Sequence, residues 1–287
     1  MKILYIAEIV GKAGIYALKK RLAELKKEKN PDFIIACGDG ATGGSGLGRN
    51  HAAYIRKLGV QVITTGENCF FKKDLTENIG KIPYVLRPDN LNTEAPGIGS
   101  RIFNTGNQKI AVAVLLGQSG FGRLHGNNPF SGLHALLERQ RLETPFVIID
   151  FHAQATAEKQ TFFAMADGFC SMVVGSHTRV QTADERILPG GTAVITDAGR
   201  TGSMESVWGN NRESRIKEYL TGIPDWTRDA WEKPELQGVF AEIAENGRAI
   251  SIERLRLTVA EPGNAVQEDE NDPSGESIET NESTTSP

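Results

Sequence analysis

The feature that most constrains the fold of this chain is the alternation of short apolar runs with amphipathic segments in its first half. The apolar runs have the length of buried strands, and the segments between them repeat apolar residues at helical spacing. The predicted strands are 2–8, 33–37 and 60–65, and the predicted helices are 16–27 and 51–57. Because strands that alternate with helices pair in parallel, the sequence predicts an α/β fold.

The second half carries further apolar runs with fewer long helical segments between them. The predicted strands here are 110–116, 146–151, 171–174, 238–243 and 249–257, and the predicted helices are 133–141 and 155–166. The last two strands flank the turn 245–247, so we expect them to form an antiparallel pair. Strands without long helices between them favour a mixed or second sheet, and we expect two sheets that form a sandwich flanked by helices.

The C-terminal segment 261–287 differs in composition from the rest of the chain. It holds eight acidic residues, no lysine and no arginine, and it almost lacks large apolar residues. Since such a segment cannot bury enough surface to offset its ordering entropy, we expect one folded domain over 1–260 and a disordered acidic tail over 261–287. With the tail set aside, the net charge of −4 becomes +4 for the body. That excess suits an anionic substrate but is too small to indicate nucleic-acid binding.

The sequence carries no signal for export or membrane insertion. Glu8 interrupts the apolar run at the N-terminus, no cleavage site follows, and no apolar stretch approaches the length of a membrane span. The three cysteines, Cys37, Cys69 and Cys170, lie far apart, within or beside apolar runs, and form no C-x-x-C pair. We therefore expect buried free thiols in a reducing compartment, and a cytoplasmic protein without a membrane partner.

Polar side chains with ligand chemistry follow several of the predicted strands. They are Glu8, Asp39, Glu67 with Asn68, His152 and His177. Because ligands gather at the carboxyl ends of strands in α/β sheets, we expect these side chains to meet. A single histidine after a strand is more often structural, but two of the five histidines and several carboxylates share such positions. Imidazole and carboxylate groups bind zinc, manganese or iron, and such a metal can activate water against a phosphoryl group.

The loop 38–48 after the second predicted strand is rich in glycine, and its first six residues match G-x-G-x-x-G. That pattern also occurs in dinucleotide-binding folds, where an acidic residue follows about 20 positions later. Here the loop follows the second strand and no such acidic residue is placed at a strand end. We interpret the glycines as residues that let the backbone pass close to the metal site.

Seven blocks of the sequence occur in a characteristic order. They are AEIVG at 7–11, GDGA at 38–41, TGENCFFKKDL at 65–75, LRPDN at 86–90, DFHAQATAEK at 150–159, GSHTRVQTADERILPGGTAVITDAGRTG at 175–202 and RESRIKEYLTGIP at 212–224. Over residues 1–257 the chain thereby resembles the calcineurin-like metallophosphoesterases, and specifically their YmdB-type branch. The resemblance implies a four-layer α-β-β-α sandwich of two mixed sheets, a di-metal centre, and hydrolysis of phosphodiesters such as cyclic nucleotides. It also implies a homo-oligomer and leaves an RNA-related partner open.

The site that the resemblance implies departs from the family's pattern at six positions. Glu8 replaces an aspartate, Asp39 a glutamate, Gly40 and Glu67 two asparagines, Asn68 the histidine usually thought to act as general acid, and Arg179 the last histidine. One metal position then keeps four potential ligands, which are Asp39, Glu67, His152 and His177. The other position would use Glu8, Asp39 and Arg179, and a guanidinium has no lone pair to give a metal.

These departures define the hypothesis for the site. We expect Arg179 to border the lost metal position, to pair with Glu8 and to hold a substrate phosphoryl group, while one or two divalent ions (Fe, Mn or Zn) bind nearby. Asn68 stands at the catalytic position but cannot donate a proton, and general acid catalysis is typically worth about 10²–10⁴-fold. The sequence thus predicts a metal-dependent phosphodiesterase with an altered site. The alternative is a catalytically impaired homologue that binds a metal or nucleotide, or regulates a partner.

Overall fold

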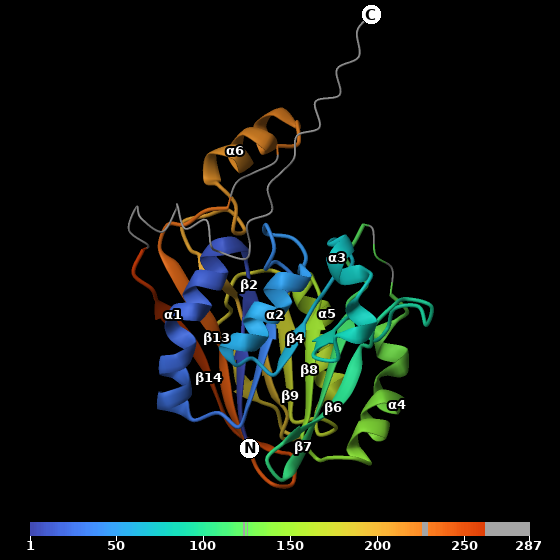
Figure 1. The fold of residues 1–287 in the computed structure, drawn as a ribbon. Coiled ribbons are helices and arrows are strands. Elements are labelled where there is room, and N and C mark those ends of the chain that lie inside the picture. The colour runs from blue at the N-terminus through green and yellow to red at the C-terminus, as the bar shows by residue number, and fades with distance from the viewer. Residues whose placement is uncertain (123, 125, 226–228, 262–287) are drawn as a thin grey trace, which may run out of the picture.

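The computed structural model describes residues 1–122, 124, 126–225 and 229–261, which form two β-sheets with helices on their outer faces (Figure 1). The predicted acidic tail lies outside the described residues, except for Glu261. Within this part of the chain, no helix is long and apolar enough to cross a membrane. All three cysteines are buried free thiols, as predicted.

The first sheet has a parallel centre extended by antiparallel strands. Its strands are β1 (Lys2–Ile6), β2 (Glu8–Ile9), β3 (Phe33–Cys37), β4 (Val62–Thr64), β5 (Val85–Leu86), β12 (Arg200–Ser203), β13 (Pro234–Ile243) and β14 (Ala249–Thr258). The order is β2-β12-β13-β1-β3-β4-β5, and β14 pairs with β13. Strands β1, β3, β4 and β5 run parallel, and β13 pairs antiparallel with β1 and β14. The predicted hairpin near the C-terminus is therefore confirmed.

The second sheet is parallel at its centre and antiparallel at both edges. Its strands are β6 (Ser100–Thr105), β7 (Gln108–Leu116), β8 (Val147–His152), β9 (Met172–Ser176), β10 (Arg186–Ile187) and β11 (Ala193–Ile195), in the order β10-β11-β9-β8-β7-β6. Strands β7, β8, β9 and β11 are parallel, and β6 and β10 are the antiparallel edges. Both sheets are thus mixed, as the sequence predicts.

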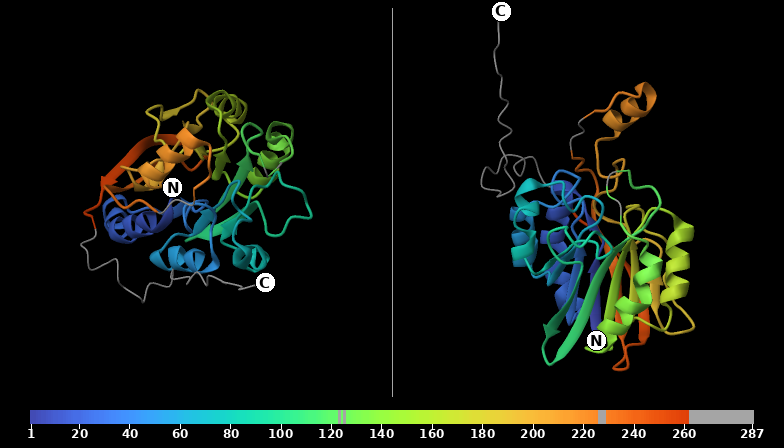
Figure 2. Two further views of the ribbon diagram at one scale, coloured as in Figure 1. Left: turned by 90° about the horizontal axis from the view of Figure 1, so that it is seen from above. Right: turned by 90° about the vertical axis from the view of Figure 1, so that its right-hand side faces the viewer.

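Three apolar cores separate four layers. Alternate side chains of β1 point to opposite faces, so Ile3 and Tyr5 enter the core between the sheets while Leu4 and Ile6 face the helices. Helices α1 (Gly11–Lys29) and α2 (Arg49–Leu58) cover the first sheet, and α4 (Pro129–Arg141) and α5 (Thr156–Ala166) cover the second (Figure 2). The predicted four-layer α-β-β-α sandwich is confirmed.

The structure differs from the sequence-based prediction at element ends. The predicted strand 2–8 is interrupted at Ala7, and β2 pairs with β12 instead of continuing beside β3. The first helix starts at Gly11, well before the predicted residue 16. Glycine weakens helix propensity, which hides this start in the sequence. At Gly14 a Cβ atom would lie 2.4 Å from the carbonyl oxygen of Thr201, so the small residue lets the helix approach β12 closely.

Several short or exposed elements had no counterpart in the prediction. They are β5, β6, β10, β11, β12, α3 (Lys73–Thr76), a 3₁₀ turn (Ile79–Lys81) and α6 (Arg212–Thr221). Helix α6 buries none of its residues and projects from the body, at the end of the sandwich opposite the N-terminus (Figures 1 and 2). Elements this short or this exposed carry too little apolar periodicity to be recognised in a sequence.

Candidate metal centre

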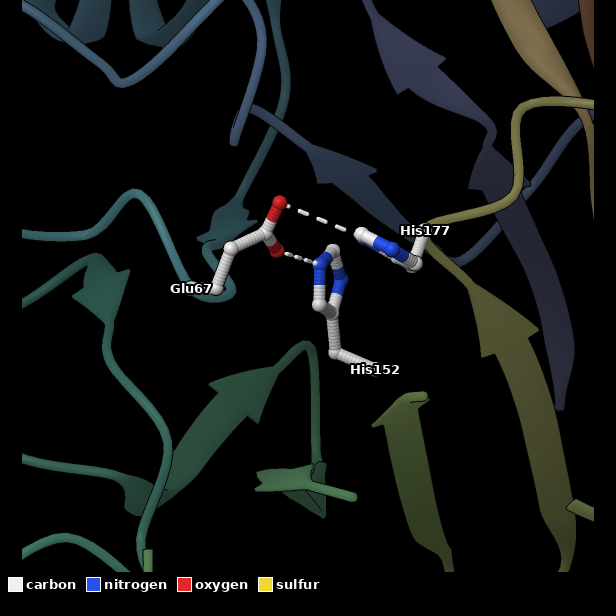
Figure 3. Close-up of side chains that lie close together, drawn as sticks. All are labelled: Glu67, His152 and His177. Atoms are coloured by element: carbon white, nitrogen blue, oxygen red, sulfur yellow. Dashed lines mark hydrogen bonds and ion pairs between the residues drawn. The ribbon is translucent and has the colours of Figure 1, made fainter. Parts of the chain in front are cut away.

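The carboxyl ends of strands from both sheets bring three predicted ligands together. Glu67 follows β4, His152 ends β8 and His177 follows β9. One ligand atom from each of the three side chains lies within 4.8 Å of the others (Figure 3). Glu67 contacts Nε2 of His152 through one oxygen, and its other oxygen lies 3.2 Å from Nδ1 of His177. The chain therefore presents a carboxylate and two imidazoles to one point, which is a normal ligand set for zinc, manganese or iron.

Asp39, the fourth predicted ligand of this position, borders the cluster. Its Oδ2 lies 3.8 Å from Nε2 of His152, and it accepts hydrogen bonds from the backbone N–H groups of Gly66 and Asn68. The backbone can pass this close to His152 only because residue 66 is glycine, since a Cβ atom there would lie 2.2 Å from Nε2 of His152. Asp39 is fully buried beside the ligands, but none of its oxygens lies close enough to all three to belong to the cluster.

The charges of these buried groups depend on one another. Burial alone would lower the pKa of His152, but the carboxylates of Glu67, Asp39 and Glu8 raise it to about 10. Burial also opposes ionisation of Glu67, yet the ion pair with His152 holds its pKa well below the usual range. Burial and the neighbouring charge of Glu67 together raise the pKa of Asp39 to about 7. Without a metal, protonated His152 thus supplies the positive charge that the carboxylates require.

The polar groups of the cluster would be better satisfied with a bound metal than by one another. Nδ1 of His177 is buried and makes no hydrogen bond of acceptable geometry to any described residue, although it faces Glu67. A buried ring nitrogen that makes no hydrogen bond is costly, and a metal ion would satisfy it. The short contact between Glu67 and His152 joins two groups that a metal could bridge instead. The residues present therefore suit one divalent cation.

The predicted ion pair between Glu8 and Arg179 is confirmed. Nε and Nη2 of Arg179 donate to the same oxygen of Glu8 at 2.9 and 2.6 Å, and the side chains are almost entirely buried. A Cβ atom on Gly40 would lie 2.7 Å from Nη2 of Arg179 and 2.9 Å from Oε1 of Glu8. The glycine at position 40 therefore makes the space that the guanidinium fills, in agreement with a glycine loop that passes close to the site.

Arg179 has little capacity left to bind a substrate. Besides Glu8, it donates to the carbonyl oxygens of Trp208 at 2.8 Å and of Gly44 at 2.9 Å. Its guanidinium also stacks on the Trp208 ring, with 3.8 Å between Cζ and the ring centroid. Four of the five N–H donors of an arginine are thereby used, so this arrangement leaves no pair of donors for the bidentate grip on a phosphoryl group expected from the sequence. Oε2 of Glu8 is buried without a hydrogen-bond partner among the described residues.

Three residues around the cluster have backbone conformations that L-residues rarely adopt. The φ angles are +94° at His177, +60° at Arg179 and +59° at Trp208. Such conformations cost about 1–3 kcal/mol each and persist where the surrounding structure holds them. Between His177 and Arg179, the buried carboxylate of Asp197 fixes the backbone, since it accepts from the N–H and the hydroxyl of Thr178. Backbone strain at His177 and Arg179 supports a functional role for the loop that follows β9.

Asn68, the predicted catalytic residue, is held between two carboxylates. Its Nδ2 donates to Oδ2 of Asp39 at 2.7 Å and to Oε1 of Glu67 at 2.9 Å. Both amide hydrogens are therefore used, and an amide cannot protonate a leaving group. In this arrangement Asn68 orients the two acidic side chains.

Sequence analysis missed two aromatic neighbours of the cluster. The Phe121 ring lies 5.0 Å from the ring of His177 and 6.1 Å from that of His152, and the Trp208 ring lies 6.0 Å from that of His177. Both aromatic residues sit in irregular loops, where no periodicity marks them. Their apolar rings lower the local polarity, which strengthens the interactions among the charged groups.

Comparisons with known proteins agree with this fold. The sequence pattern of the YmdB-like protein family matches residues 4–255. A 2',3'-cyclic-nucleotide 2'-phosphodiesterase from Bacillus subtilis (strain 168) is 37% identical over 258 residues, covering 90% of this chain and 97% of that protein. The crystal structure of a novel phosphatase from Mycoplasma pneumoniae has a TM-score of 0.84 at 32% identity, covering 91% of this chain and 95% of that one.

A crystal structure from Thermus thermophilus, described as that of a hypothetical protein, gives the same TM-score of 0.84 at 30% identity and covers 91% of this chain and 100% of that one. Sequence and fold therefore agree over most of the length of each relative. The family predicted from the seven sequence blocks is confirmed, and this chain belongs to the YmdB-like family of proteins.

Proposed function

We propose that this protein is a metal-dependent phosphodiesterase that acts on cyclic nucleotides or related phosphodiesters. The observation that carries the proposal is the convergence of Glu67, His152 and His177 at the strand ends. The relative named as a 2',3'-cyclic-nucleotide 2'-phosphodiesterase supports the substrate class. A small phosphodiester is also consistent with the positive charge that the sequence assigns to residues 1–260.

The chain's own residues would hold one divalent ion, Fe, Mn or Zn. Glu67, His152 and His177 would bind it directly, and Asp39 would complete the set. A bound divalent metal polarises a phosphoryl oxygen and lowers the pKa of bound water. Arg179 would keep a fixed positive charge at the second position, where it is paired with Glu8. This role replaces the direct phosphoryl contact that the sequence suggested.

The lack of a general acid narrows the choice of substrate. Asn68 cannot protonate a leaving group, so the proposed enzyme would forgo about 10²–10⁴-fold of acceleration on alkoxide leaving groups. The loss of rate would be smallest for substrates whose leaving group, such as nitrophenolate, is stable as an anion. We therefore expect the ratio of the hydrolysis rate of activated diesters to that of natural nucleotides to be higher here than in an enzyme that has a general acid.

A catalytically impaired homologue that binds a metal or nucleotide is the second candidate. Two observations favour it. Asn68 donates both amide hydrogens to neighbouring carboxylates, and Arg179 donates four of its N–H groups to other groups of the protein instead of to a substrate. Such a protein would bind its ligand without turnover and could regulate a partner. The two candidates share the metal centre and differ in catalysis alone.

Hydrolysis assays separate the two candidates. Bis-p-nitrophenyl phosphate and 2',3'-cyclic AMP are incubated with the purified protein and with Mn²⁺, Fe²⁺, Zn²⁺ or Mg²⁺ in turn. The enzyme proposal predicts turnover that His152→Ala abolishes and that His134→Ala, an exposed histidine of α4, leaves unchanged. Absence of turnover with every metal, together with nucleotide binding, would establish the impaired homologue.

The remaining sequence-based predictions are part of the proposal. We retain a folded domain over 1–260 with an acidic tail, a cytoplasmic location and an open RNA-related partner as predictions. For the homo-oligomer there is one supporting observation, a stripe of exposed apolar side chains on and just after α6. Its members are Ile216, Tyr219, Leu220 and Ile223. Light scattering of the wild type and of Leu220→Asp would test it, and a monomeric wild type would refute it.

A further inference from the structure

A buried carboxylate lies behind His152, on the side away from the metal position. Asp150 belongs to β8 and is 1% exposed. It accepts hydrogen bonds from the hydroxyl groups of Tyr5 at 2.6 Å, Thr64 at 2.5 Å and Ser176 at 2.6 Å. Tyr5 and Thr64 come from the first sheet and Ser176 from the second, so Asp150 joins the two sheets beneath the site.

The three hydroxyl groups satisfy both oxygens of this carboxylate. Each hydroxyl donates its single hydrogen, and the carboxylate oxygens accept. No Lys, Arg or His forms an ion pair with Asp150 among the described residues, so the hydroxyls alone compensate its burial. Burial and the adjacent Asp150 both raise the pKa of Tyr5, which keeps its hydroxyl a donor.

The direction of the next hydrogen bond follows from this arrangement. A serine hydroxyl has a single hydrogen, and that of Ser176 is donated to Asp150. Nδ1 of His152 lies 2.8 Å from the same Ser176 oxygen, which can therefore only accept from it. Nδ1 must carry a hydrogen, and Nε2 is the nitrogen that faces Glu67 and the metal position.

We propose that Asp150 and Ser176 are positioning residues that hold His152 with its hydrogen on Nδ1 and turn the Nε2 lone pair toward the metal. The inference rests on the metal centre proposed above and extends it to residues that touch neither metal nor substrate. A group that hydrogen-bonds the ring nitrogen facing away from the metal orients a ligating histidine and sets its tautomer. Loss of such a group typically lowers metal affinity about 10–100-fold.

The geometry of Asp150 indicates which substitution is most informative. Oδ2 accepts two hydroxyls, from Tyr5 and Thr64, whereas Oδ1 accepts one, from Ser176. In Asp150→Asn the amide oxygen would therefore keep the Oδ2 side, and the NH₂ group would face Ser176. The serine would then donate to Nδ1 of His152, which places the hydrogen on Nε2, where it opposes the metal. Tyr5→Phe is the matched control, since it removes a buried hydroxyl from Asp150 but leaves the chain from Asp150 to His152 intact.

Zn²⁺ affinity, measured by competition with a chelator, is the test. We expect Asp150→Asn and Ser176→Ala to weaken Zn²⁺ binding about 10–100-fold, while Tyr5→Phe stays within about threefold of the wild type. Thermal unfolding of the metal-free proteins shows that each variant is folded. Affinities equal to the wild type for both Asp150→Asn and Ser176→Ala, or an equal loss in Tyr5→Phe, would overturn the inference.

A second readout needs no variant. In ¹⁵N NMR spectra of the Zn²⁺-loaded wild type, we expect His152 to carry its hydrogen on Nδ1 and the metal on Nε2; the opposite assignment would overturn the inference even if a variant failed to fold. A wild type that binds no Zn²⁺ would refute the metal centre itself. A wild type that binds Zn²⁺ only as tightly as both variants do would leave the proposed function standing and refute this inference alone.

Discussion

Removal of the guanidinium at position 179 should destabilise the protein strongly. Arg179→Met keeps much of the side-chain volume against Trp208 but leaves the Glu8 carboxylate buried without its cation. Glu8 is 2% exposed, and Arg179 makes four hydrogen bonds, two of them to Glu8 and one each to the carbonyl oxygens of Trp208 and Gly44. Breaking a buried ion pair by removing one partner costs about 3–5 kcal/mol, because an uncompensated charge remains inside. A pair on the surface would cost about 1 kcal/mol or less.

The assay is urea unfolding of the metal-free protein in a chelating buffer, so that metal binding does not contribute. With a slope of about 3 kcal/mol per molar urea, the expected loss lowers the midpoint by about 1–1.7 M. Glu8→Gln leaves the buried Arg179 cation without its counterion, but the guanidinium keeps an amide and two carbonyl acceptors, so this substitution should cost less. In the double variant Glu8→Gln with Arg179→Met, neither charge of the pair remains. Its loss in free energy of unfolding should therefore be about 2 kcal/mol smaller than the sum of the two single losses.

Strict additivity of the two substitutions would refute the reasoning, because it would mean that the charges of Glu8 and Arg179 do not interact. A cost of Arg179→Met below about 1 kcal/mol would do the same, since it would place the pair in the range of exposed salt bridges. Either result would also remove the argument that Arg179 stands in for a second metal ion.

Three further perturbations test the site. The pKa of metal-free His152 is raised to about 10, so below that pH a metal must displace a proton from His152. Zn²⁺ affinity should therefore fall about tenfold per pH unit as the pH decreases from about 9 to about 7.5. Titration calorimetry measures this slope. Gly66→Ala should abolish Zn²⁺ binding, because the new methyl group meets His152, and an unchanged affinity would contradict the geometry. Lys159→Met breaks a buried 2.8 Å ion pair with Asp197, and a loss of about 3–5 kcal/mol is expected in urea unfolding, whereas a loss below about 1 kcal/mol would show that the pair is not buried in solution.

The strand-end residues could be predicted because two local signals coincide. Each apolar run marks a buried strand, and the polar residue that follows it marks the strand's carboxyl end. Parallel pairing places His152 and His177 at one end of the second sheet, and packing of the two sheets brings Glu67, at the end of β4 in the first sheet, close to them. The pairing of Glu8 with Arg179 was predicted from the family resemblance instead, because a carboxylate and a cation stand where the family has two ligands of one metal position.

What could not be predicted depends on loops that carry no periodic pattern. The carbonyl groups of Gly44 and Trp208 use up the donors of Arg179, and neither contact leaves a trace in local sequence. The same holds for Asp150, which appears in sequence as one polar residue inside an apolar strand. Its role emerges only when Tyr5 from the first sheet and Ser176 from the second donate to it.

The central claim is a centre for one metal ion per chain, and metal content tests it most directly. Purified protein is stripped with a chelator, reloaded with Mn²⁺, Fe²⁺ or Zn²⁺, passed through a desalting column and analysed by inductively coupled plasma mass spectrometry. We predict one tightly bound ion per chain in the wild type and none in His152→Ala, because Glu67 and His177 then lose their shared partner. Two tightly bound ions per chain, or none in the wild type, would contradict the account.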